Sequence, residues 1–490
     1  MAPLPFESRN RVLLRSTLIY APAIFLTRIS ALLLLIIATR LIDQDEYGLL
    51  TLVVSVGEMT DVAVTNWLRI ALVRLGGKGT ISRGSLALAA RVLVITTVVA
   101  IALSVAAAGF IAPERAWEFS LAVSGYLVVG AVGRYALSVL QMQQRHSVYS
   151  MMEFLRAFLQ LVLPVTAMLV FKDQFLTVSL ASSLGWLIAG LVALALALPK
   201  TVPGPSRFSY RELFALGIPL IVIAVMGFGL NSAERVLLKV YYDAGAVAIF
   251  AAAYALARQP IDLVSNAINM GGFPEVVARF DADGPEAAAS FLSHTMALML
   301  RLTLPIAALL VALSSDIVQL VLPPEYHGAA AQLFPIIAFS VICANLTAFV
   351  YEVVILAHKR PILMVMVNAP GSVVTIGLSV LLIPMFSVVG AAFALAGGML
   401  TSLIACIIVS ERLTHIPVPW RDIMLSAGIA VLSGGTAYIA STLLADLWVI
   451  FRLGFAGAAG GSVFLALNAM LFPRETADFA RRLRLRFSRS

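Results

Sequence analysis

The chain has 490 residues, of which 61% are hydrophobic and 12% charged, with a mean hydropathy of +0.97 and a formal net charge of +8. A soluble domain carries roughly 25% charged residues, so this composition excludes a soluble globular protein and indicates a polytopic membrane protein. The basic residues fall in short loops and one tail, which predicts no nucleic-acid partner. Cys343 and Cys406 lie inside apolar stretches and predict neither a disulfide framework nor a metal site.

Apolar stretches of about 20 residues or more predict fourteen transmembrane helices and an all-α fold. The predicted spans are 16–39, 47–70, 85–111, 119–142, 152–171, 175–198, 213–233, 244–270, 291–313, 330–357, 362–383, 388–410, 423–444 and 453–471. They predict two six-helix lobes and an appendage, with boundaries as follows: N-lobe 1–198, polar cytoplasmic linker 199–212, C-lobe 213–410, two further helices within 411–471, and a basic tail 472–490.

The distribution of Lys and Arg predicts the orientation in the membrane. With the N-terminus inside, most of the 34 basic residues lie in cytoplasmic connections and in the tail RRLRLRFSRS, whereas few lie in outer connections. Cytoplasmic connections of membrane proteins carry an excess of Lys and Arg. Both ends of the chain are therefore predicted to be cytoplasmic.

Three short motifs recur in the same order about 200 residues apart. They pair TRLIDQDEYGLL (39–50) with LKVYYDAGAVAIF (238–250), IAPERAW (111–117) with LPPEYHG (322–328), and QQRHS (143–147) with AHKRP (357–361). Their spacing grows slightly along the chain, which fits an extra loop predicted at 272–290. Because both halves hold six helices and start on the same side, the pattern predicts a parallel duplication about an axis along the membrane normal.

These motifs also carry a family resemblance, which covers roughly residues 10–471. The matching stretches are DQDEYGLL (43–50), YYDAGAVAIFAAAYALA (241–257), LPPEYHGAAAQLFPIIAFS (322–340) and LIPMFSVVGAAFALAGG (382–398). They resemble the polysaccharide exporter branch of the MOP superfamily, which includes the Wzx-type O-antigen and exopolysaccharide flippases. Glu234-Arg235 stands where many members carry an Asp-Arg pair.

The resemblance implies two six-helix lobes in a MATE-like V around a central cavity. It also implies a substrate, an oligosaccharide on undecaprenyl diphosphate, which would move from the inner to the outer leaflet of a bacterial inner membrane. Membrane lipids, a polysaccharide polymerase and a co-polymerase are the implied partners.

Three arginines lie near the middle of predicted spans: Arg28, Arg258 and Arg301. A charge at that depth is costly unless it faces protein, water or a ligand. A diphosphate is a suitable ligand, because the guanidinium fork matches phosphate oxygens and stays charged when desolvated. A structural ion pair is the alternative, above all for Arg258 with Asp262 one turn later.

Four more arginines lie in the cytoplasmic portions of their spans, where they either extend to the interface or form an electropositive vestibule; they are Arg69, Arg91, Arg134 and Arg156.

The carboxylates inside predicted spans are Glu58, Asp61, Asp262 and Glu352. Glu58 and Asp61 are one helical turn apart, so at most one is comfortably ionised without a partner. A protonated carboxyl would suit ion coupling, and pairing with a neighbouring arginine is the alternative. Asn345 shares a helix face with Glu352, which equally suits interhelical hydrogen bonding.

Other functions are less well matched by the residues. A MATE-type drug or cation exporter needs aromatics and negative charge at its site, and a membrane polysaccharide polymerase or ligase usually carries a sizeable outer loop. GGKGT (76–80) lacks the GxxxxGK[ST] spacing of an ATP-binding loop. The sequence therefore predicts a transporter with no catalytic residues, no metal and no cofactor.

The predicted topology can be tested with reporter fusions. A reporter that is active only in the periplasm should be active after Pro324 and silent after Pro205 or Arg360, because only Pro324 lies in a predicted outer connection. A silent fusion at Pro324, with the protein still accumulating, would contradict the predicted orientation of the second half.

Overall fold

The computed structural model describes residues 26–75, 81–171, 174–360 and 362–473. These residues form helices and no β-sheet; one isolated parallel bridge joins Ser82 to Val202. The beginning of the first predicted span, the GGKGT stretch and the basic tail beyond residue 473 lie outside the described residues. The chain divides into two compact units, residues 1–251 and 252–490, and the boundary falls within helix α10 (Ala244–Asp283).

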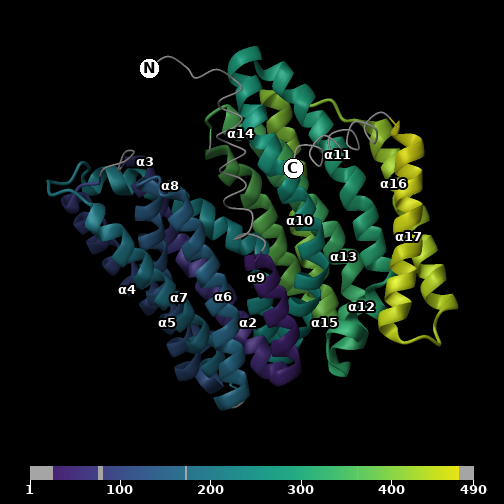
Figure 1. Cartoon of the computed structure of the whole chain (residues 1–490), viewed down its shortest axis with the longest axis horizontal. Helices are drawn as coiled ribbons and strands as arrows, with labels where there is room; N and C mark the ends of the chain where they lie inside the picture. The colour runs from purple at the N-terminus through teal and green to yellow at the C-terminus, as the bar shows by residue number, and fades with distance from the viewer. Residues whose placement is uncertain (1–25, 76–80, 172–173, 361, 474–490) are drawn as a thin grey trace. The chain divides into compact units, whose positions relative to one another are not determined.

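The first unit is a bundle in which α5 is the central helix. Residues 26–41 are helical. The elements that follow are α2 (Gln44–Asp61), π-helix η1 (Val62–Asn66), α3 (Trp67–Leu75), α4 (Arg83–Ile111), η2 (Pro113–Arg115), α5 (Ala116–Met142), α6 (His146–Phe171), α7 (Phe175–Ala197), η3 (Leu198–Lys200), α8 (Tyr210–Asn231) and α9 (Ala233–Tyr241). Helix α5 packs against α2, α4 and α7, and α6 packs against α7 (Figure 1).

The second unit contains the remainder of α10 and a C-terminal hairpin packed on α11. Its elements are α11 (Pro285–Ala312), α12 (Ser314–Val321), η4 (Pro324–Tyr326), α13 (His327–Leu346), π-helix η5 (Thr347–Tyr351), α14 (Glu352–Ala357), α15 (Ile362–Leu413), α16 (Trp420–Leu443) and α17 (Val449–Leu471). Helix α16 packs against α11 and α17 (Figure 1). Arg452 on α17 forms an ion pair with the buried Asp316 on α12 at 2.5 Å, which fixes the end of the hairpin.

Each of the fourteen predicted spans has a helical counterpart among the described residues. Ten helices are long and apolar enough to cross a membrane, or eleven if Leu220–Asn231 and Ala233–Tyr241, which meet at 51°, form one span. The 52-residue α15 contains two of the predicted spans, because Ser387 (φ 49°, ψ −128°) breaks it. The first two predicted spans correspond to the helical residues 26–41 and to the continuous helical run 44–75.

The prediction of a loop at 272–290 is wrong. Helix α10 continues to Asp283, and only Gly284, with φ +90°, separates it from α11. This stretch is polar enough to leave the membrane but rich in alanine, and Arg279 pairs with Glu275 one turn earlier at 2.8 Å. Alanine is the best helix former and such i,i+4 pairs add support, so the segment stays helical outside the apolar layer.

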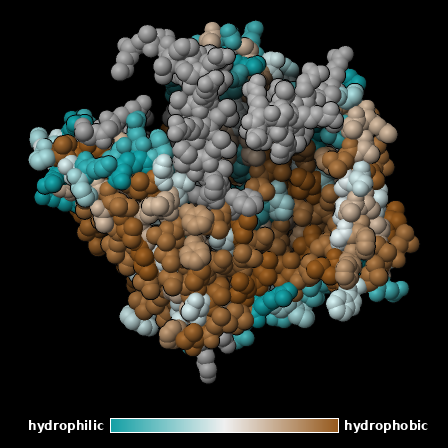
Figure 2. All heavy atoms as spheres, in the orientation of Figure 1, coloured by the Kyte–Doolittle hydropathy of each residue, from teal (hydrophilic) through white to brown (hydrophobic). Residues whose placement is uncertain are grey.

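Large apolar side chains are exposed along the helices, as expected for a membrane protein. On α4, Val94, Ile95 and Val98 are each about 60% exposed, and other helices show similar stripes. In Figure 2 hydrophobic side chains cover the flank of the first unit, whereas hydrophilic ones gather at the end where α3 and α8 lie. Helices satisfy their own backbone groups, so such surfaces are stable against lipid.

The segment that follows α7 is held against the beginning of α4. The backbone N–H groups of Arg83 and Gly84 donate to Val202 and Gly204 at 2.8 and 3.0 Å, and Val202 donates to Ile81. A Cβ on Gly84 would lie 2.6 Å from the Gly204 carbonyl oxygen, so only glycine allows this approach. The domain boundary predicted at 199–212 stays a prediction, and the first part of that segment packs with the first unit.

We expect Gly84→Val to detach this segment and to destabilise the protein by about 1–3 kcal/mol, the usual cost of overpacking. Thermal unfolding of the detergent-purified protein measures the effect. Gly428→Ala is the matched control, because a Cβ there meets open space and alanine favours a helix. Equal melting temperatures for the Gly84 variant and the wild type would contradict the expectation.

Candidate functional site

Arg258, on α10, is the centre of the candidate site in the second unit. Its Nε donates to Asp262 Oδ2 at 2.7 Å and its Nη1 donates to the Tyr254 hydroxyl at 2.6 Å. The guanidinium also lies 5.3 Å from the centre of the Tyr254 ring. The side chain is nevertheless 41% exposed. The ion pair considered from the sequence therefore forms, and it leaves the Nη2 edge of the guanidinium open.

Asp262 is fixed in turn by a second helix. Its side chain is buried, and its Oδ1 accepts from Asn345 Nδ2 on α13 at 3.2 Å. Asn345 also donates to the Ser265 hydroxyl at 3.0 Å. An asparagine that bridges two helices in this way orients the carboxylate, and the carboxylate orients the arginine.

A second charged cluster lies in the first unit. Asp61, which is fully buried, forms an ion pair with Arg134 on α5 and accepts a hydrogen bond from Thr65. The ring of Trp186 on α7 lies 5.1 Å from the Arg134 guanidinium and 5.7 Å from that of Arg156 on α6. Two cations therefore share one aromatic ring, and the buried carboxylate neutralises one of them.

Local features of the sequence make room for this cluster. The π-helix Val62–Asn66 begins directly after Asp61, and a π-helix widens a helix by one residue, often at functional sites. On α5, a Cβ at Gly133 would lie 2.5 Å from the Trp186 ring nitrogen. The glycine thus allows the indole to pack closely against α5.

The two clusters occupy related places in the internal repeat. The offset of 211 residues that relates IAPERAW to LPPEYHG carries Arg134 onto Asn345. The offset of about 200 that relates the earlier motifs carries Asp61 to within one residue of Asp262. In each half, therefore, a buried aspartate bonds to the residue at the equivalent position of the repeat, two spans later in the chain. That residue is Arg134 in the first half and Asn345 in the second. The second half has asparagine there, and its cation comes from Arg258 on the aspartate's own helix.

The remaining predicted site residues are dispersed. Arg28 and Glu58 are exposed. Arg301 lies 4.7 Å from the ring centre of Phe472, beyond the end of α17. Glu352 accepts from Asn368 Nδ2 on α15 at 2.8 Å. Asn345 and Glu352 both form interhelical hydrogen bonds, as the sequence suggested, but with different partners.

The sequence allows Asp61 to pair with a neighbouring arginine but does not indicate which one. Arg134 is that arginine, and Arg156 donates to Glu153 and Gln160 at 2.7 and 2.6 Å. The repeat offset was the available signal, because it places Arg134 opposite the polar Asn345. Within the described residues, no group of three or more His, Cys, Asp or Glu side chains could hold a metal ion.

Comparison with known proteins identifies the class. A family model described as polysaccharide biosynthesis protein matches residues 37–331, more than half of the chain, so the chain belongs to this family. No curated protein matches the sequence significantly.

Solved structures identify the fold. The chain is similar to the structure described as lipid II flippase MurJ in an inward closed conformation, with a TM-score of 0.70 and 13% identity over 93% of this chain and 99% of that one. It is also similar to the eukaryotic MATE transporter AtDTX14, with a TM-score of 0.55 and 14% identity over 85% and 99% of the two chains. A third similar structure is described as an inward-facing multidrug resistance MATE transporter of the MOP superfamily. Its TM-score is 0.56, with 12% identity over 81% of this chain and 94% of that one. The predicted all-α polytopic fold and the predicted membership of a polysaccharide biosynthesis family are confirmed.

We expect Asp61→Asn to destabilise the protein by about 3–5 kcal/mol, because it leaves Arg134 without its buried counterion. The double variant Asp61→Asn/Arg134→Gln should recover most of the loss, and thermal unfolding measures both. Glu114→Gln is the control: its partner Lys239 lies 2.8 Å away, but Glu114 is exposed, so the loss should stay below about 1 kcal/mol. No recovery in the double variant would contradict a pairwise role.

Proposed function

We propose that this protein is a flippase that moves an undecaprenyl-diphosphate-linked oligosaccharide across the bacterial inner membrane, with both chain ends in the cytoplasm. The substrate would serve a surface polysaccharide such as an exopolysaccharide, capsule or O-antigen. The observation that carries the proposal is Arg258, a guanidinium on a membrane helix that is held on one side and exposed on the other.

The geometry of Arg258 suits a phosphate ligand. Asp262 and Tyr254 use the Nε proton and one Nη1 proton, so the second Nη1 proton and both Nη2 protons remain for a ligand. A fixed guanidinium loses little rotamer freedom when it binds, and its fork matches two phosphate oxygens. Asp262 thus acts as a positioning residue that holds the cation where a diphosphate can reach it.

The comparisons support the same class of substrate. The family description refers to polysaccharide biosynthesis, and one similar structure is described as a lipid II flippase. Arg28, which is exposed on the helical residues 26–41, is assigned the same role as Arg258. Arg301, whose guanidinium lies over the Phe472 ring, would also bind the diphosphate or the glycan.

The buried acids favour this substrate over the cation of a drug exporter. Asp61, Asp262 and Asp316 each form an ion pair with an arginine. A carboxylate that is neutralised in this way offers little attraction to a second cation. Ion coupling stays a proposal for Glu58, Asp61, Asp262 and Glu352. Protonation of Asp61 or Asp262 would leave the arginine of its ion pair without a counterion.

The test is a mutant cycle on α10. Arg258→Ala should lower export of the lipid-linked glycan, measured per molecule of accumulated protein, about tenfold or more, because the ligand loses its charged hydrogen bonds. Arg258→Lys should rescue only part of the activity, since a point charge replaces a fork. The double variant Arg258→Ala/Asp262→Asn should stay inactive.

Arg279→Ala is the matched control on the same helix. Arg279 pairs with Glu275 at the same i,i+4 spacing and with the same exposure, 42%, so export should change less than about twofold. If the double variant at 258 and 262 exports glycan normally, Arg258 is only the counterion of Asp262 and the ligand role is wrong.

A further inference from the structure

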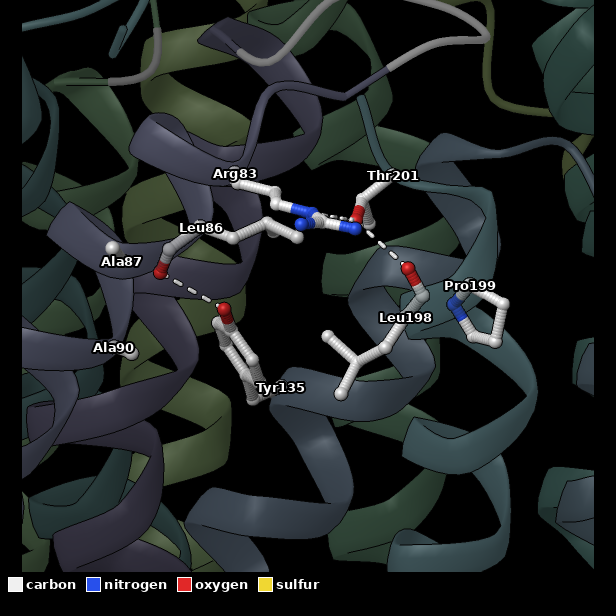
Figure 3. A pocket seen from close by; sticks show the side chains of 8 residues that line it. All are labelled: Arg83, Leu86, Ala87, Ala90, Tyr135, Leu198, Pro199 and Thr201. Atoms are coloured by element: carbon white, nitrogen blue, oxygen red, sulfur yellow. Dashed lines mark hydrogen bonds between the residues drawn. The ribbon is translucent and has the colours of Figure 1, made fainter. Parts of the chain in front are cut away.

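A groove opens on the first unit between the beginning of α4 and the end of α7. Its volume is about 480 Å³, within the range of about 300–1,000 Å³ that is usual for small-molecule sites. Ala87 and Ala90 form one wall and Leu198 the other, with Tyr135 at the base (Figure 3). Tyr135 donates to the Leu86 carbonyl at 2.9 Å, so its hydroxyl is satisfied and the floor is mainly apolar.

Arg83 lies at the mouth of this groove. Its Nε donates to the Thr201 hydroxyl at 3.4 Å, and Thr201 donates to the Leu198 carbonyl at 2.7 Å (Figure 3). The two Nη groups have no partner among the described residues and point across the opening. The backbone N–H of Arg83 is already bonded to Val202, so the guanidinium, and not the helix terminus, is the donor available to a ligand.

The surroundings of the groove are basic at one end and apolar at the other. Lys200 is exposed in η3, and Arg145 reaches the Leu196 carbonyl at 2.5 Å in the last turns of α7. None of the described residues that line the groove is acidic. Along α4, Val94 and Val98 continue the face of Ala87 and Ala90 and are exposed. This arrangement matches a molecule with an anionic head and long apolar chains.

We propose that this groove binds one anionic glycerophospholipid, with its phosphate on the Nη groups of Arg83 and its acyl chains along Ala87, Ala90, Val94 and Val98. The positive charge of Arg83, Lys200 and Arg145 selects an anionic headgroup over a zwitterionic one. The small side chains of Ala87 and Ala90 leave the space that the glycerol and the first methylene groups occupy. This site is separate from Arg258 and does not depend on the transport proposal.

The experiment is native mass spectrometry of the detergent-purified full chain after incubation with phosphatidylglycerol or phosphatidylcholine. The wild type should retain one phosphatidylglycerol, with phosphatidylcholine held about tenfold more weakly. Arg83→Gln should reduce retention of phosphatidylglycerol by a similar factor. Ala87→Trp should do the same without changing the charge, because the indole fills the groove.

Two matched controls separate this site from general attraction to lipid. Arg211→Gln removes an exposed arginine on α8 outside the groove, and Ala106→Trp enlarges an exposed alanine on the far half of α4; both should retain phosphatidylglycerol as the wild type does. Equal loss in Arg83→Gln and Arg211→Gln would overturn the proposal in favour of diffuse surface charge. Unchanged retention in Ala87→Trp would also overturn it, as would displacement of phosphatidylglycerol by undecaprenyl phosphate in a competing incubation.

Discussion

The structure depends on the rule that a charge buried in a membrane protein must have a partner. Each of the four buried carboxylates in the described residues has an arginine partner: Asp61 with Arg134, Glu234 with Arg235, Asp262 with Arg258, and Asp316 with Arg452. Removing one partner from such a pair costs several kcal/mol, whereas the intact pair contributes little net stability. The pairs that join two helices, Asp61 with Arg134 and Asp316 with Arg452, therefore specify which helices meet.

The two halves of the chain satisfy this rule in different ways. In the first half the counterion of Asp61 comes from another helix and lies against Trp186. In the second half Asn345 takes the place of that arginine, and Arg258 supplies the charge from the aspartate's own helix. A cation on the same helix does not need to lie between two helices, so it can stay exposed. The duplication thus yields a partly buried guanidinium on Arg134, 25% exposed, and a more exposed one on Arg258, 41% exposed.

Much of the fold could be predicted because helix length and hydropathy are local properties of the sequence. The Arg258–Asp262 pair was predictable for the same reason, since both residues lie one turn apart on one helix. No local pattern predicts the Asp61–Arg134 pair, because which faces of α2 and α5 meet depends on packing; only the long-range offset of the repeat pointed to Arg134. The extension of α10 to Asp283 was missed because a polar composition resembles a loop even where alanine and an Arg279–Glu275 pair favour a helix.

The length of α10 has a mechanical consequence. Its 40 residues extend about 60 Å at 1.5 Å per residue, about twice the hydrocarbon thickness of a bilayer. A tilt of 40°, the upper end of the usual range, accommodates only about 40 Å, so about 20 Å of the helix must lie outside the hydrocarbon layer. Gly284 alone joins this part to α11. A movement of the beginning of α11 is therefore passed directly to the helix that carries Arg258. That helix can bend at Pro260 and Pro274, where a backbone hydrogen bond is lost.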